Sequence, residues 1–212
     1  MHDREKGMMS QPGNIKQHVE STLKLLQKWA SENYVSLEKL IPDSETEKKR
    51  REKNRTTPRV NETSKLANDY RMEVMNFKSK NKLVLDQFRQ NQFSHSELGL
   101  SSDILAVEEI DRAFQSIYAE EAQLAAKITN GYLNAAAQNI PENELQLAGI
   151  KIIQSIDISL VAWSTVIRQA PLLKDQCWKF LVLLDRMRKR IVVDFPQLEA
   201  SNNKETDELV KH

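Results

Sequence analysis

The chain has 212 residues, 40% of them hydrophobic, and a formal net charge of +1, so it is long enough for one or two domains with a buried core. A charge so close to zero excludes a global field that would draw the protein to nucleic acid or membrane, and any such affinity must come from a local patch. The single cysteine, Cys177, excludes an intramolecular disulfide and fits a reducing compartment.

Helical patterns separated by prolines fill most of the chain. Five glycines and six prolines are few for the hairpins of a β-rich fold of this length. The first pattern runs from about Asn14 to Ala30, with apolar residues at helical spacing. A charged run, EKKRREKNR, follows a candidate N-cap at Asp43 and Ser44 and ends before Pro58.

The most regular pattern lies in a predicted helix over residues 61–93. Its apolar positions alternate in steps of three and four, which is a heptad pattern. They are Ala67, Tyr70, Val74, Phe77, Val84 and Phe88, with Asn81 in the same register. A second helix with this alternation is expected after the cap Ser101-Ser102-Asp103. Its stripe consists of Val107, Ile110, Phe114, Ile117, Leu124 and Ile128, interrupted by Glu121.

Two further helices complete the predicted fold. Pro141 opens a helix over about 142–169 that is apolar on most sides, which is typical of a central helix. Pro171 starts the last helix, which ends before Pro196. We therefore expect an all-α fold, a bundle of about five to six helices over residues 61–198. A polar N-terminal region (1–60, a helix plus a charged linker or helix) precedes it, and a flexible tail (199–212) follows.

The basic segment at residues 48–59 is a candidate phosphate-binding site, because several cations on one surface release the counterions condensed on nucleic acid. Its cations are Lys48, Lys49, Arg50, Arg51, Lys53, Arg55 and Arg59. The alternative is a solvated helix, since Glu45 pairs with Lys49 and Glu47 with Arg51 at i,i+4. A second cluster, Arg186, Arg188, Lys189 and Arg190, fits the charged outer face of a helix.

The heptad stripe is a candidate seam for a partner helix or for a second copy of the chain. The seam residues are Tyr70, Val74, Phe77, Asn81, Val84 and Phe88. A buried Asn81 at an a-type position would fix register and dimeric state. In the alternative, this face packs inside the monomer and Asn81 bonds to a neighbour or to water.

Residues with catalytic or metal-binding chemistry form no known motif. Glu121 and Asp157 interrupt apolar stripes, and each is expected to be half of a structural ion pair, or to face outward at the edge of its stripe, rather than a general acid or base. The histidine spacing gives no metal site, and no nucleotide-binding or serine-hydrolase motif is present, so we expect neither a metal nor a cofactor. Cys177 lies among apolar residues and is expected to be a small buried hydrophobe.

Arg89 and His95 form an Arg-x-x-x-x-x-His element at the end of the long predicted helix. This element, seven residues long, resembles the short motif of HEPN ribonucleases. The resemblance implies that Arg89 and His95 would handle the scissile phosphate and the proton. The alternative is a loop cap, with Ser94 and Ser96 on either side of His95.

The patterns favour a non-enzymatic interaction or scaffold protein that acts through partner-helix packing or self-association. Nucleic-acid binding through residues 48–59 is the alternative, and a HEPN-like ribonuclease is the third. The N-terminus lacks the apolar region of a secretory signal, and no apolar run reaches the roughly 18 residues that span a bilayer. We therefore expect a cytoplasmic protein with no membrane partner. In a eukaryotic host, residues 48–51 would serve as a nuclear address.

Overall fold

The computed structural model describes residues 12–33, 35, 58–82, 104–136 and 141–195. These residues form five α-helices and one 3₁₀ turn, and none of them lies in a strand. The elements are α1 (Pro12–Glu32), α3 (Pro58–Lys80), α5 (Ile104–Ala136), α6 (Glu142–Gln169), η1 (Pro171–Leu173) and α7 (Lys174–Asp194). The predicted all-α helical bundle is confirmed.

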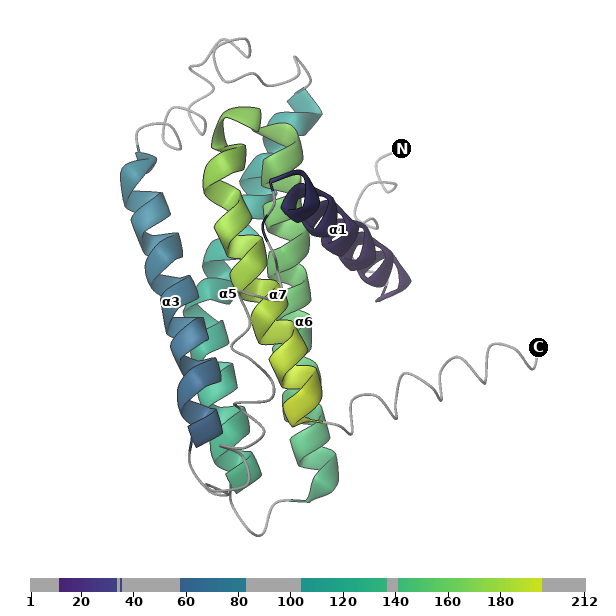
Figure 1. The fold of residues 1–212 in the computed structure, drawn as a ribbon, viewed down its shortest axis with the longest axis vertical. Coiled ribbons are helices and arrows are strands. Elements are labelled where there is room, and N and C mark those ends of the chain that lie inside the picture. The colour runs from purple at the N-terminus through teal and green to yellow at the C-terminus, as the bar shows by residue number, and fades with distance from the viewer. Residues whose placement is uncertain (1–11, 34, 36–57, 83–103, 137–140, 196–212) are drawn as a thin grey trace, which may run out of the picture.

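The four helices α3, α5, α6 and α7 form an antiparallel bundle in which the chain direction alternates from each helix to the next (Figure 1). α5 and α7 each contact both α3 and α6, so α3 and α6 occupy opposite corners. Side-chain pairs fix the antiparallel alignment of α3 and α7, because Glu62 contacts Arg190 while Glu73, further along α3, contacts Lys179. Among the described helices, α3 therefore has two main neighbours, α5 and α7, and one outward side.

Prolines set the boundaries of the last two helices, as the sequence predicts. Pro141 lies at the N-cap of α6, one position before the first turn in which we expected it. Gln169 ends α6, and the N–H of Ala170 still donates to the carbonyl oxygen of Val166 at 2.8 Å. Pro171 cannot donate to this ladder, and it starts a 3₁₀ turn rather than α7 itself. α7 consequently begins three residues later than predicted.

Aromatic side chains from all four bundle helices meet at the centre of the core. The ring of Trp163 on α6 stacks on that of Phe180 on α7, with centroids 4.0 Å apart. Phe77 on α3 meets Trp163 edge-on at 5.3 Å, and Phe114 on α5 lies 6.1 Å from Phe77. Such offset and edge-on contacts add to the stabilisation from apolar burial. The inner stripe of α3 is therefore part of a core shared with α5, α6 and α7.

Helix α1 packs against α6 and, to a smaller extent, α7 (Figure 1). Its apolar face is buried there, with Val19 and Leu26 at most 2% exposed. The ring of Trp29 stacks on that of Trp178, at 4.9 Å between centroids and 15° between planes. This helix, which the sequence groups with the polar N-terminal region, thus shares the core of the bundle. Residues 36–57 of that region lie outside the described residues.

Of the described helices, α6 alone is long and apolar enough to cross a membrane by length and composition. The candidate span is Asn143–Gln169, and 61% of its 18-residue apolar window is buried inside the bundle. Core helices of soluble proteins also combine this length and composition with burial, so the span is weak evidence for a membrane location. Its apolar character instead fits the central position predicted from the sequence.

Candidate interaction surface

The described part of the predicted heptad seam faces the interior of the chain. Tyr70, Val74 and Phe77 are at most 2% exposed, and Asn81 is 7% exposed. α5 and α7 cover them, so these side chains are not available to a second helix from another molecule. The described part of the seam is therefore an intramolecular contact, and the prediction that these four residues form an oligomer or partner surface is wrong. Val84 and Phe88 lie outside the described residues.

Asn81 makes its polar contacts within the same chain. Its Nδ2 donates to the carbonyl oxygen of Phe77, at 2.9 Å, and to Oε1 of Gln176 on α7, at 3.2 Å. A buried amide is tolerated when its hydrogen-bonding groups are paired. Asn81 thus aligns α3 with α7, which is the alternative that the sequence left open.

Ion pairs hold both flanks of α3 to its neighbours. On one flank, Arg71 lies 3.2 Å from Glu121 of α5, and the Lys78 ammonium lies 4.4 Å from the centre of the Tyr118 ring. On the other flank, Glu62 contacts Arg190 and Glu73 contacts Lys179, both on α7. These contacts occupy the charged groups at the edges of α3 and leave the face between them directed outward.

We call this outward face the outer stripe. All its members are exposed: Lys65, Asn68, Met72, Met75, Asn76 and Ser79. Met72 is 56% and Met75 49% exposed, and they are two of the four large hydrophobic residues exposed among the described residues. Met is flexible and polarizable, and it is common on surfaces that adapt to a partner. This stripe was not predicted, although the spacing of Met72 and Met75 opposite the apolar residues is visible in the sequence.

Lysines border the outer stripe at both ends. Lys65 lies at its beginning, and Lys80 and Lys82 lie at its end, all exposed. Asp69 is the one exposed acidic residue beside the stripe among residues 62–82, because Glu73 is half-buried in its contact with Lys179. The face therefore combines two methionines with a positive border.

The two carboxylates that interrupt apolar stripes are both members of ion pairs. Glu121 pairs with Arg71, and Oδ1 of Asp157 accepts a hydrogen bond from Nε of Arg188 at 2.8 Å. Burial raises the pKa of Asp157, while the hydrogen bond and charge of Arg188 lower it. Both carboxylates thus join neighbouring helices, as predicted.

A third polar cluster, which was not predicted, joins α5 to α6. Lys127 Nζ lies 3.1 Å from Glu120 Oε2, and Ser155 Oγ contacts both groups. Ser155 is only 1% exposed. Because a substrate cannot reach its hydroxyl, the cluster does not have the arrangement of a Ser–Lys nucleophile. Its chemistry fits a connection between two helices.

The remaining candidate nucleophile, Cys177, and candidate metal ligand, His18, lie on different helices. Cys177 is fully buried, and burial raises the pKa of its thiol to about 12. Such a thiol stays protonated and unreactive. His18 is exposed on α1. Within the described residues no three His, Cys, Asp or Glu side chains are placed to hold a metal ion.

Of the two basic clusters, only the second has side chains that the structure describes. Residues 48–57, the Arg59 side chain and the pair Arg89 and His95 lie outside the described residues. In the second cluster, three of the four cations contact acids: Arg188 with Asp157, Lys189 with Asp185, and Arg190 with Glu62. The expectation that this cluster is only a charged outer face is corrected, because two of these pairs join α7 to α6 and to α3.

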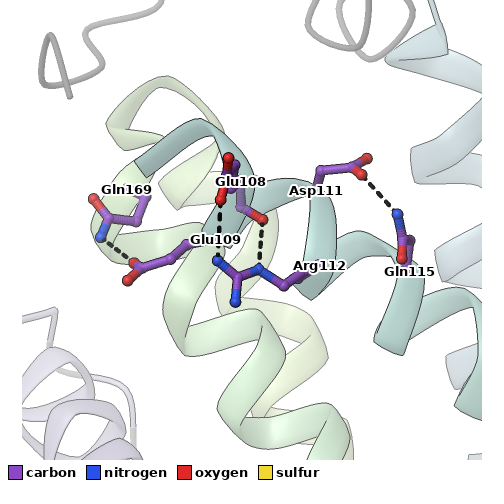
Figure 2. A network of polar contacts seen from close by, with 6 residues as sticks. All are labelled: Glu108, Glu109, Asp111, Arg112, Gln115 and Gln169. Atoms are coloured by element: carbon purple, nitrogen blue, oxygen red, sulfur yellow. Dashed lines mark hydrogen bonds and ion pairs between the residues drawn. The ribbon is translucent and has the colours of Figure 1, made fainter. Parts of the chain in front are cut away.

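An acidic patch lies at the N-terminal part of α5, beside the end of α6 (Figure 2). Arg112 contacts Glu108 at 3.5 Å, and Gln115 Nε2 donates to Asp111 Oδ2 at 2.6 Å. Gln169 of α6 donates to Glu109 at 2.8 Å. These contacts are exposed to solvent, where ion pairs contribute little stability. The helix dipole favours carboxylates near a helix N-terminus. The patch is therefore explained as a solvated helix surface.

Comparison with known proteins assigns the chain to no family. No protein-family model matches the chain, and none of the curated proteins or solved structures with which it was compared matches it.

Proposed function

We propose that this chain is a non-catalytic helical-bundle protein that acts by binding another protein through the outer stripe of α3. The observation that carries the proposal is the adjacent exposure of Met72 and Met75, 56% and 49%, on a helix whose opposite face is buried. Large apolar side chains that lie together in solvent are a feature of interaction surfaces.

The attachment of α3 supports a role as a rigid platform. Tyr70, Val74 and Phe77 anchor the helix in the core, and ion pairs bind its flanks to α5 and α7. A partner that docks on a fixed helix need not pay for ordering that helix, which favours affinity. Self-association remains an alternative form of this function, now at a face other than the predicted seam.

Site-specific photo-crosslinking in the native cell tests the proposal. A photoreactive residue replaces Met72 in one variant, Met75 in a second, and Gln123, exposed on α5, in a control. We expect discrete adducts from the two α3 positions and none from position 123. An adduct of twice the mass of the chain indicates self-association. Identical adducts at all three positions, or none at 72 and 75, would contradict the proposal.

Nucleic-acid binding is kept as a second proposal, and it rests on the sequence of residues 48–59 alone. If three to five of its cations contact phosphates, log affinity should fall against log salt with a slope of roughly −3 to −5. Changing Lys48, Lys49, Arg50 and Arg51 together to Ala should flatten that slope by about two or three units. Absence of binding at low salt, or binding unaltered by this substitution, would refute it.

A further inference from the structure

We infer that the partner of the outer stripe is an acidic amphipathic helix that lies along α3, with apolar residues over Met72 and Met75 and carboxylates beside Lys65, Lys80 and Lys82. This inference rests on the proposed function and specifies the chemistry of its partner. It follows from the order of charges and apolar groups along α3.

The shape of the surface favours a helix. The exposed residues of the stripe recur at Lys65, Asn68, Met72, Met75 and Ser79, in alternating steps of three and four. This is the spacing with which two helices pack along each other, and a helix laid on such a stripe presents its own apolar residues at the same spacing. From Lys65 to Lys82 the stripe and its lysine border extend for about 26 Å, at 1.5 Å per residue. A partner of about three heptads would cover it.

The charges favour an acidic partner. Lys65, Lys80 and Lys82 are exposed, and none of them makes an ion pair with another described residue, whereas Arg71 and Lys78 are engaged with α5. Among residues 62–82, Asp69 is the one exposed acidic residue beside them. Complementary charge on a partner speeds association and disfavours partners of the same sign.

The same lysines disfavour a second copy of this chain on the stripe. In a parallel pair of α3 helices, each lysine would meet its equivalent in the other copy. In an antiparallel pair centred on Met72 and Met75, Lys65 would approach Lys82 of the other copy. Like charges across an interface oppose its formation.

The polar residues within the stripe disfavour a lipid surface. Asn68, Asn76 and Ser79 are interleaved with the methionines on the same outward side. A membrane-bound helix would have to place these amide and hydroxyl groups against lipid, whereas a partner helix offers side chains that can hydrogen-bond to them. Surface-binding helices also present Trp, Phe or Leu on the apolar face, which this stripe lacks.

The test uses the full-length protein and two labelled synthetic peptides of about three heptads each. Both peptides have leucine at positions a and d, and one has glutamate and the other lysine at e and g. Fluorescence anisotropy should show that the Leu/Glu peptide binds, that salt weakens its binding, and that the Leu/Lys peptide does not bind. Vesicles containing anionic lipid form a separate arm, in which we expect no binding.

Three variants assign the binding to the stripe. Met72→Gln with Met75→Gln should abolish binding of the Leu/Glu peptide. Replacement of Lys65, Lys80 and Lys82 by Gln should weaken it about tenfold, since each exposed pair contributes little by itself. The matched control changes three exposed lysines elsewhere, Lys16, Lys24 and Lys151, to Gln. It alters net charge equally and should leave binding within about twofold of the wild-type value.

Several outcomes would overturn this inference. They are no binding of the Leu/Glu peptide, equal binding of both peptides, equal weakening by the control, or binding to vesicles that requires Met72 and Met75. A crosslinked dimer through position 72 would also overturn it, because the occupant would then be a second copy. If positions 72 and 75 capture a different protein while the Leu/Glu peptide fails to bind, the proposed function survives and only the acidic helix is refuted.

Discussion

The indole Nε1 of Trp163 donates a hydrogen bond to the hydroxyl oxygen of Tyr70, at 3.0 Å, across the diagonal of the bundle. Both side chains are fully buried. Burial raises the pKa of the Tyr70 hydroxyl well above its usual value, so the group stays neutral at physiological pH. This contact links α3 to α6, the two bundle helices at opposite corners.

Tyr70→Phe should therefore destabilise the protein although it removes a single oxygen atom. The Trp163 N–H would stay buried without its acceptor, which costs about 1–3 kcal/mol. Chemical denaturation measures the loss in the free energy of unfolding. A double-mutant cycle with Trp163→Phe isolates the contact, because the coupling energy should be favourable. Additive effects of the two substitutions would show that the hydrogen bond does not contribute.

Gly131 of α5 lies directly against the side chain of Ile152 on α6. A Cβ added at this position would lie 2.7 Å from Cδ1 of Ile152. Gly131→Ala gains about 1 kcal/mol of helix propensity but overpacks the core, at a cost of about 1–3 kcal/mol. We expect a net loss in thermal stability. Ile152→Val removes the obstructing methyl group, so the double variant should be more stable than Ile152→Val alone. If Gly131→Ala destabilises equally in both backgrounds, the contact with Ile152 is not the cause.

Cys177 should resist thiol reagents for as long as the bundle is folded. Its side chain is fully buried, so a reagent cannot reach it. Burial also raises the pKa of the thiol to about 12, so the reactive thiolate does not form near neutral pH. Labelling followed by mass spectrometry should proceed at the rate of unfolding and become fast in denaturant. Rapid modification of the native protein near neutral pH would contradict this packing.

The Asp157–Arg188 pair should make stability depend on pH in an unusual direction for a carboxylate. Burial raises the pKa of Asp157 above its ordinary value of 3.8, so the folded state holds the proton more tightly than the unfolded state. Its contribution to stability is thus fully present below pH 3.8 and is lost as pH rises through the folded-state pKa. Unfolding free energies at several pH values measure this. The difference between wild type and Asp157→Asn should fall with rising pH and then level off.

Asp69→Asn is the control for that experiment, because it removes one negative charge from an exposed site. A difference between wild type and Asp157→Asn that grows with pH would show that the charge of Arg188 outweighs burial at Asp157.

The stack of Trp29 on Trp178 should determine how firmly α1 is held. Trp29→Leu keeps an apolar side chain but removes the ring contact, which contributes about 0.5–1.5 kcal/mol beyond its buried area. Hydrogen exchange should become faster in α1 and change little in α5, and the near-ultraviolet circular dichroism of the tryptophans should weaken. Unchanged exchange in α1 would indicate that Val19 and Leu26 suffice to hold the helix.

The sequence by itself determined the class of fold and much of its segmentation. Helical periodicity and proline placement act over a few residues, so the range 142–169 and the N-terminal helix are visible without knowledge of distant neighbours. The burial of Cys177 and the pairing of Glu121 and Asp157 also follow from local context, because an apolar stripe tolerates a carboxylate when a cation neutralises it. The partners of these carboxylates do not follow from it.

Only the tertiary structure decided which surfaces are occupied. An apolar heptad stripe looks the same whether it packs on its own chain or on another, so the pattern around Asn81 could not show that Gln176, 95 residues away, receives its hydrogen bond. For the same reason Arg190 looked like part of an outer charged face until the fold brought Glu62, 128 residues away, beside it. Met72 and Met75 are identified as a candidate surface because the opposite side of α3 is buried in the core and ion pairs engage both of its flanks. Periodicity shows that a helix has two different faces, but long-range packing decides which of them is exposed to solvent.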